Sequence, residues 1–151
     1  MLTYLSKTYG IGGTLKNAPE NFIVEEITND GTILTLSSEH GAVNKTLDSR
    51  LETKENEAGK FVHFILQKRN WSTSDAINAI AKCSHVSASR FNFAGTKDKV
   101  SISTQLASCF GLEKEKIESL NIKDIKINGA WYANDKVRLG DLLGNRFTIR
   151  V

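Results

Sequence analysis

The stretch Phe61-Val-His-Phe-Ile-Leu-Gln67 is the strongest strand signal of the sequence, and Trp71-Ser-Thr-Ser-Asp75 follows it closely. Apolar residues on both faces predict a central strand that is buried on both sides. The hydroxyls and the carboxylate of the second stretch can cap free backbone N–H groups at a helix start, and Ile77 and Ile80 follow at helical spacing. The two stretches predict an α+β fold in which a helix over about residues 74–84 packs on one face of a sheet.

Around this unit, short β-prone runs alternate with turn signals. Phe22-Ile-Val-Glu-Glu-Ile27 predicts a strand with Phe22, Val24 and Glu26 on one face. The turn signal Asn29-Asp-Gly31 predicts a hairpin to a second strand over residues 32–36. The remaining expected elements are a loop or mobile insertion at 37–59, a short β segment at 90–94, a strand at 100–107, an exposed helix at 113–120, a β run at 122–133 and a strand at 147–151. We expect a mostly antiparallel sheet.

The composition is that of one globular domain, with 151 residues of which 40% are apolar and 25% are charged. No run approaches the roughly 20 apolar residues of a membrane span, so we expect a cytoplasmic protein with no membrane partner. The formal net charge of +3 lies in residues 123–151, which hold six Lys and Arg against three Asp and Glu. This excess favours a polyanionic partner, with a solvated basic face as the plainer alternative.

The cysteines and histidines show no spacing typical of a metal site. Cys83 and Cys109 are predicted to be buried free thiols. His63, inside an apolar strand, is predicted to be a satisfied histidine near the core and not a catalytic base. We therefore expect no metal ion.

Asp98 is the acid with the most suggestive surroundings. It lies between Lys97 and Lys99, directly after Gly95 and Thr96, at the end of an apolar strand. Two neighbouring ammonium groups favour the ionised carboxylate, which is then available as a nucleophile or a base. A solvated turn is the alternative interpretation.

The basic C-terminal segment also carries aromatic residues. Tyr132 and Phe147 stand among Arg138, Arg146 and Arg150. Aromatic rings stack on unpaired bases and guanidinium groups hold phosphates, so the combination suits single-stranded or flipped RNA. Packing of Phe147 in a core is the alternative.

Three groups of residues form a pattern from about residue 10 onward. The first is Gly13-Thr-Leu-Lys16 with Pro19-Glu-Asn-Phe22-Ile-Val-Glu-Glu26, the second is Phe93-Ala-Gly-Thr-Lys-Asp-Lys99 with Ser103-Thr-Gln105, and the third is Arg138-Leu-Gly140 with Gly144-Asn-Arg-Phe147. In this order and spacing, the groups resemble the TruD family of tRNA pseudouridine synthases.

The resemblance implies an isomerase that converts a uridine in the D arm of tRNA, uridine 13, to pseudouridine without a cofactor or a metal. Asp98 matches the catalytic aspartate of the family. It either attacks C1′ covalently or stabilises an oxocarbenium-like sugar and removes the 2′ proton. Lys16 and Lys97 are expected to hold phosphates, and Phe147 to stack on the extruded uracil. The residues expected to line the site and bind the RNA are Lys16, Phe22, Glu26, Gly95, Lys97, Gln105, Asn145 and Phe147.

Members of this family continue with a further motif and an inserted second domain, and the 151 residues contain neither. A strand pattern that runs to Val151 also suggests a chain cut from something longer. We expect residues 1–151 to be the N-terminal part of a catalytic domain, inactive or weakly RNA-binding alone, with exposed sheet surface that favours self-association. The rival interpretation is a non-catalytic RNA-binding module.

Overall fold

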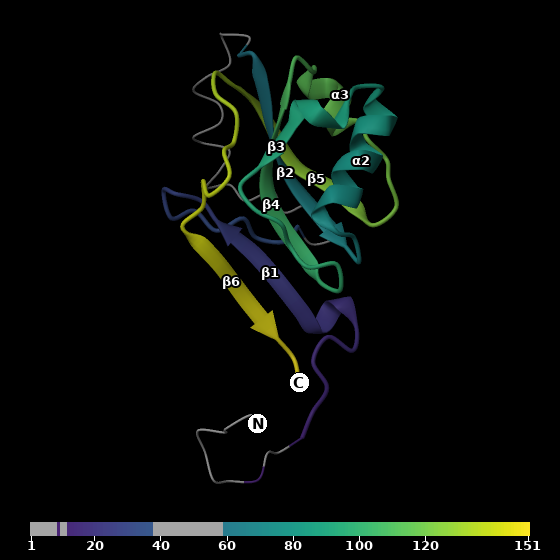
Figure 1. The fold of residues 1–151 in the computed structure, drawn as a ribbon, viewed down its shortest axis with the longest axis vertical. Coiled ribbons are helices and arrows are strands. Elements are labelled where there is room, and N and C mark those ends of the chain that lie inside the picture. Colours follow the sequence, from purple (N-terminus) through teal and green to yellow (C-terminus); the bar gives the residue numbers. More distant parts are fainter. Residues whose placement is uncertain (1–8, 10–11, 38–58) are drawn as a thin grey trace.

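The computed structural model describes residues 9, 12–37 and 59–151. The predicted loop at 37–59 lies outside the described residues except for its two end positions. Figure 1 shows a long twisted sheet with the helices gathered beside its upper part. The strands are β1 (Phe22–Ile27), β2 (Phe61–Arg69), β3 (Phe91–Phe93), β4 (Ile102–Phe110), β5 (Ile125–Ala133) and β6 (Gly144–Ile149). The helices are α2 (Thr73–Ser84) and α3 (Lys114–Glu118), with short 3-10 turns η1 (Pro19–Asn21) and η3 (Ala88–Arg90).

The described strands form one sheet in the order β5-β2-β4-β1-β6, and β3 also pairs with β4. Strands β1 and β4 run parallel, and the other pairs are antiparallel. The expected α+β fold with a mostly antiparallel sheet is therefore confirmed. Strand β2 lies between β4 and β5 and pairs with both along its length, which makes the predicted strand at 61–67 a central one.

The core lies between the sheet and α2, as the helical spacing predicted. The Ser72 side chain accepts the backbone N–H of Asp75 and so caps the start of α2. Val62, Phe64 and Leu66 alternate along β2 and are fully buried on the side that α2 covers. The buried core on this face consists of Val62, Phe64, Leu66, Ala76, Ile77, Ile80, Ala81, Phe91, Ala107, Cys109, Ile117, Ile125 and Ala130. Among the described residues, no helix is long and apolar enough to cross a bilayer.

Residues 32–37 cross the opposite face of the sheet, and the second strand predicted there was wrong. A single bridge joins Ile33 to Ile27 of β1. After it, the backbone bonds to side chains of three adjacent strands. Thr104 Oγ1 donates to Leu34 O, Leu36 N donates to Glu25 Oε1 over 3.0 Å, and Ser37 N donates to Gln67 Oε1 over 2.8 Å. The hairpin ends because these distant side chains satisfy the backbone groups that a strand partner would otherwise bond.

The two cysteines have different surroundings, so the prediction of two buried thiols was half wrong. Both are free; Cys109 is buried in the core, whereas Cys83 lies on the exposed side of α2. Burial raises the pKa of the Cys109 thiol to about 11. His63 is a satisfied histidine, as predicted, because its Nε2 lies 2.6 Å from the backbone oxygen of Asp135.

One edge of β4 is shared by two strands. Strand β1 pairs with it at residues 102–104, and β3 pairs with it at residues 107–109. Gln105 and Leu106 lie between these paired stretches. The backbone N–H of Leu106 donates to the Glu26 carboxylate over 3.0 Å, so a side chain continues the ladder where β1 leaves β4. The candidate site is built around this break.

Candidate functional site

The Asp98 carboxylate lies on the loop between β3 and β4 and is 57% exposed. It forms an ion pair with Lys16, which is 82 residues away in the sequence. The Lys16 ammonium also lies over the ring of Phe22, 4.2 Å from its centroid. The Phe22 ring is 5.9 Å from that of Phe147, centroid to centroid. The structure therefore brings these four predicted site residues together.

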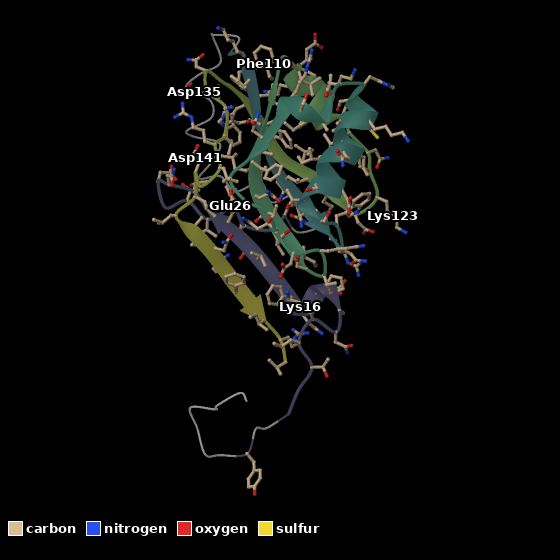
Figure 2. The ribbon with its side chains drawn as sticks, in the orientation of Figure 1. Lys16, Glu26, Phe110, Lys123, Asp135 and Asp141 are labelled. Carbon is tan, nitrogen blue, oxygen red and sulfur yellow. The ribbon has the colours of Figure 1, made fainter. Side chains whose placement is uncertain are left out.

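The sheet places the strand-borne site residues on one face, because directly paired residues on neighbouring strands point to the same side. Phe147 is paired with Val24, and Asn145 is paired with Glu26. Phe22, Val24 and Glu26 alternate along β1 and so share that side. Figure 2 shows Lys16 near the start of β1 and Glu26 near its end. We call the surface formed by Phe22, Asn145 and Phe147 the open strip, since Phe147 is 54% exposed there.

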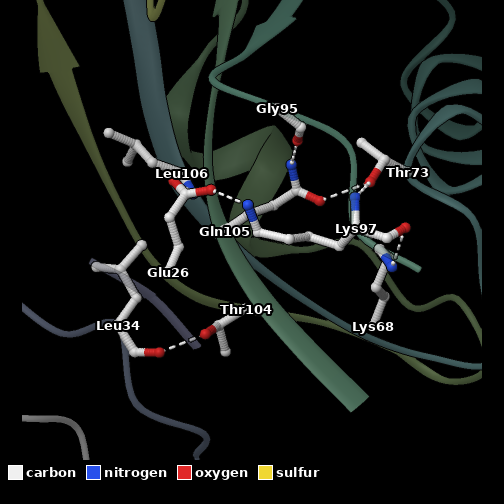
Figure 3. A network of polar contacts seen from close by, with 9 residues as sticks. All are labelled: Glu26, Leu34, Lys68, Thr73, Gly95, Lys97, Thr104, Gln105 and Leu106. Carbon is white, nitrogen blue, oxygen red and sulfur yellow. Dashed lines mark hydrogen bonds and ion pairs between the residues drawn. The ribbon is translucent and has the colours of Figure 1, made fainter. Parts of the chain in front are cut away.

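A buried network fixes the backbone before Asp98 (Figure 3). Gln105 Nε2 donates to Gly95 O over 3.0 Å, and Gln105 Oε1 accepts the Thr73 hydroxyl over 2.8 Å. Thr73 Oγ1 in turn accepts the backbone N–H of Lys97 over 2.8 Å. Gln105 and Thr73 are fully buried. Two predicted site residues, Gly95 and Gln105, thus contact each other and hold the loop.

Lys97 and Glu26 form a buried ion pair, with Nζ 2.6 Å from Oε2 and side chains that are 4% and 0% exposed. This position differs from the one expected for a lysine that holds a phosphate. Its ammonium is turned inward and occupied by a carboxylate, so it is not placed to hold a phosphate of an RNA backbone. The cation paired with Asp98 is Lys16, which no neighbour relation in the sequence indicated.

The basic aromatic cluster expected near the C-terminus is not brought together. Tyr132 lies on β5 and Phe147 on β6, and these strands stand at opposite ends of the strand order. The Tyr132 hydroxyl accepts the backbone N–H of Lys114 over 3.1 Å. Arg146 pairs with the Glu25 carboxylate over 2.6 Å, on the face of the sheet away from the open strip. Of the two aromatic residues, Phe147 alone belongs to the site.

Sequence reasoning missed the residues that hold the loop from beneath. Lys68 Nζ donates to the backbone oxygens of Lys97 and Asp98, and the Ser101 hydroxyl donates to the same oxygen of Asp98. The position of Lys68 could have been predicted from the sequence. Val62, Phe64 and Leu66 alternate along one face of β2, and the next residue of that series, Lys68, lies on the same buried face.

The arrangement combines a group that can act as a nucleophile with rings that can stack. An exposed carboxylate on an anchored loop can approach an electrophilic carbon, while the adjacent rings can stack on a planar group. Asn145 Oδ1 is buried and has no hydrogen-bond partner among the described residues, so its capacity to accept a hydrogen bond is unused in this structure. In the described part of the chain, no three His, Cys, Asp or Glu side chains gather closely enough to hold a metal ion.

Comparisons with known proteins agree on one family. The family model described as tRNA pseudouridine synthase D (TruD) matches residues 1–151. A probable tRNA pseudouridine synthase D from Methanococcus vannielii is 49% identical over 148 residues, which are 98% of this chain and 36% of that protein. A probable tRNA pseudouridine synthase D 1 from Methanocaldococcus jannaschii is 45% identical over 151 residues, covering 100% of this chain and 36% of the relative.

A solved structure has the same fold. The crystal structure of a protein assigned as tRNA pseudouridine synthase D (TruD) from Methanosarcina mazei superposes with a TM-score of 0.69 and 34% sequence identity. The match covers 97% of this chain and 28% of the other. The chain spans 36% of the length of each of the two relatives above.

Proposed function

This chain belongs to the TruD family of tRNA pseudouridine synthases, and from that membership we propose that it is the N-terminal part of the catalytic domain of an enzyme that isomerises a uridine of tRNA to pseudouridine. The proposed target is uridine 13 in the D arm. The observation that carries the proposal is the exposed Asp98 carboxylate paired with Lys16, whose ammonium lies over the Phe22 ring next to Phe147.

The proposed reaction breaks the N1–C1′ glycosidic bond, turns the uracil and joins C5 to C1′. The proton leaves C5 and a proton is gained at N1, so nothing is oxidised, reduced or added. Asp98 either forms a transient ester with C1′, which C5 of the uracil displaces, or stabilises an oxocarbenium-like sugar and takes its 2′ proton, which returns to C2′ when C5 joins C1′. Both routes need an ionised carboxylate close to the ribose, and the exposure of Asp98 supports that access.

A base that is isomerised has to leave the tRNA stack, because an enzyme cannot reach the reacting atoms of a stacked nucleotide. We assign the open strip to the extruded uracil, with Phe147 stacking on its face and Phe22 supporting Phe147 from the side. Asn145, with its free buried oxygen, is the proposed acceptor for a uracil N–H. Lys16 orients Asp98 and offers a positive charge to the backbone phosphate next to the target nucleotide.

The other assigned residues act through the protein. Glu26 and Lys97 stabilise the break in the sheet, and Gly95 and Gln105 fix the loop that carries Asp98. The proposed partner of the site is the segment that follows in the longer relatives, which would cover the open strip and contact the tRNA. Residues 1–151 alone are expected to be inactive and to self-associate through the uncovered strip.

The experiment is performed on the full-length enzyme, by which we mean the protein in which these residues are joined to that following segment. Treated tRNA is digested and its nucleosides are separated and identified by mass spectrometry. The unaltered enzyme should produce pseudouridine, and tRNA with cytidine at position 13 should gain none. Asp98→Asn should abolish turnover and leave the Kd for tRNA within about threefold. Asp135→Asn, at another exposed aspartate, is the matched control.

Turnover retained by Asp98→Asn would refute the assignment of the catalytic residue. If the unaltered enzyme binds tRNA with the salt dependence of phosphate contacts but forms no pseudouridine, the chain is an RNA-binding module.

A further inference from the structure

Lys68 brings a charged side chain to the buried face of the sheet. It follows Phe64 and Leu66 in the alternation of β2 and is 0% exposed. Burying an ammonium group away from water costs several kcal/mol unless the protein supplies partners. The chemistry proposed above makes no use of this residue, so its contacts must explain its presence.

The partners of the Lys68 ammonium are backbone carbonyls. Nζ lies 2.7 Å from Trp71 O, 3.1 Å from Asp98 O and 3.4 Å from Lys97 O. Among the residues that the structure describes, no carboxylate lies within ion-pair distance of Nζ. Carbonyl dipoles therefore hold this charge, and two of them belong to the loop that carries Asp98.

Those two carbonyls belong to the peptide groups on either side of the Asp98 α-carbon. Holding both limits rotation of the backbone at Asp98 itself, and the direction of its side chain depends on that backbone. The Ser101 hydroxyl donates to the same Asp98 oxygen over 2.7 Å. The backbone is thus fixed from below, whereas the carboxylate on the other side is 57% exposed.

We propose that Lys68 is a positioning residue for Asp98: its ammonium holds the peptide groups on both sides of Asp98 and so aims the carboxylate at the substrate. This inference rests on the proposed function and deepens it. An uncharged side chain of similar length would fill the same space but remove the ammonium donor from both carbonyls, leaving the Asp98 oxygen with the Ser101 hydroxyl alone. The loop would then sample several orientations, and a misplacement of about 1 Å costs about 100-fold in rate.

The protonated state of Lys68 matters because the ammonium supplies one N–H to each carbonyl. Burial, together with the smaller effect of the charge of Lys97, lowers the pKa of Lys68 to about 8, and the charge of Asp98 opposes this shift in part. The group therefore remains largely charged at neutral pH.

The test compares Lys68→Met with Ile80→Ala in the full-length enzyme. Ile80 is a fully buried residue of α2 and serves as a control for destabilisation of the same core. We measure kcat and KM for pseudouridine formation, the Kd for tRNA, the unfolding midpoint, and amide hydrogen exchange of residues 97–101. Lys68→Gln, which keeps amide donors, is made as well and replaces Lys68→Met if that variant does not fold.

Lys68→Met is expected to lower kcat about 100-fold with the Kd for tRNA within about threefold, and to speed exchange of the loop amides. Lys68→Gln should lie between Lys68→Met and the unaltered enzyme. Ile80→Ala should keep kcat within about threefold at a comparable loss of stability. Equal kcat in Lys68→Met and Ile80→Ala, or loop exchange unchanged by Lys68→Met, would overturn the inference. If the unaltered enzyme makes no pseudouridine, the proposed function fails, and the exchange measurement alone decides whether Lys68 holds the loop.

Discussion

The Glu26 carboxylate accepts the backbone N–H of Leu106 at the point where β1 stops pairing with β4, and its second oxygen pairs with the Lys97 ammonium. One buried side chain thus satisfies a strand edge and neutralises a buried cation. Loss of either partner would leave an uncompensated charge in a place that excludes water.

The buried pair leads to the first prediction, which concerns stability. Lys97→Met should lower the free energy of unfolding of the 151-residue chain by about 3 kcal/mol, because it leaves the Glu26 charge without a partner. Adding Glu26→Gln removes that charge and keeps an oxygen for Leu106, so the double variant should recover part of the loss. Urea unfolding, monitored by circular dichroism, measures the free energy of unfolding of the single and the double variant. A double variant less stable than Lys97→Met would contradict this account.

The second prediction concerns Lys16, whose ammonium pairs with the Asp98 carboxylate at the surface. Lys16→Met should reduce kcat of the full-length enzyme at least about tenfold, because the carboxylate loses the contact that orients it. An exposed ion pair contributes little to folding, so stability should change by less than about 1 kcal/mol. Lys99→Met is the control, because Lys99 is an exposed lysine that directly follows Asp98 in the sequence. Equal loss in the two variants would indicate a general charge effect.

Phe147 provides a third prediction, about recognition of the base. Phe147→Ala should lower kcat/KM for tRNA about tenfold to a hundredfold, in line with about 1–3 kcal/mol for the stacking of one base. Phe110→Ala is the matched control, because Phe110 is 47% exposed, lies edge-on to another phenylalanine and stands at the end of β4 opposite to the Asp98 loop. Steady-state rates at several tRNA concentrations measure the effect. A similar loss of kcat/KM in Phe147→Ala and Phe110→Ala would contradict the assignment of the open strip to the target base.

The fourth prediction follows from His63, whose pKa is lowered by burial, an effect that its contact with Asp135 opposes in part. In the window just below its ordinary pKa, the unfolded chain binds more protons at His63 than the folded chain does. Stability should therefore rise with pH through that window and fall on acidification. Replacement by glutamine should flatten this part of the profile, measured as unfolding midpoints between pH 5 and 7. His85→Asn, at an exposed histidine, should leave the slope as it is; a slope unchanged by His63→Gln would contradict the prediction.

The sequence predicted those parts of the fold that depend on local pattern. Strand β2 and helix α2 followed from apolar periodicity and from the Ser72 cap, which act within a few residues. Residues 32–36 had the same β-prone composition as a strand, yet the side chains of Glu25 and Thr104 bond to their backbone from neighbouring strands. Side chains that arrive from distant segments leave no trace in a local pattern.

In the candidate site, too, local sequence pattern predicted some features and missed those that depend on distant segments. Asp98 stood out because of the residues around it and the family that they resemble, and only the resemblance placed Lys16 in the same site. Lys97 turns inward to Glu26, and Lys16 arrives from 82 residues away. Such an exchange of partners depends on how the strands are ordered, which residue spacing does not encode.

The supports of Asp98 come from one continuous length of chain: Lys68, Thr73, Ser101 and Gln105 all lie between β2 and the end of β4. Lys16 and Phe22, which meet the carboxylate from outside, belong to a separate earlier stretch. The residues that hold the Asp98 loop and the lysine that pairs with its carboxylate thus come from separate segments of the chain. Substitutions at Lys16 can therefore change the contacts of the carboxylate and leave the residues that hold the Asp98 backbone in place.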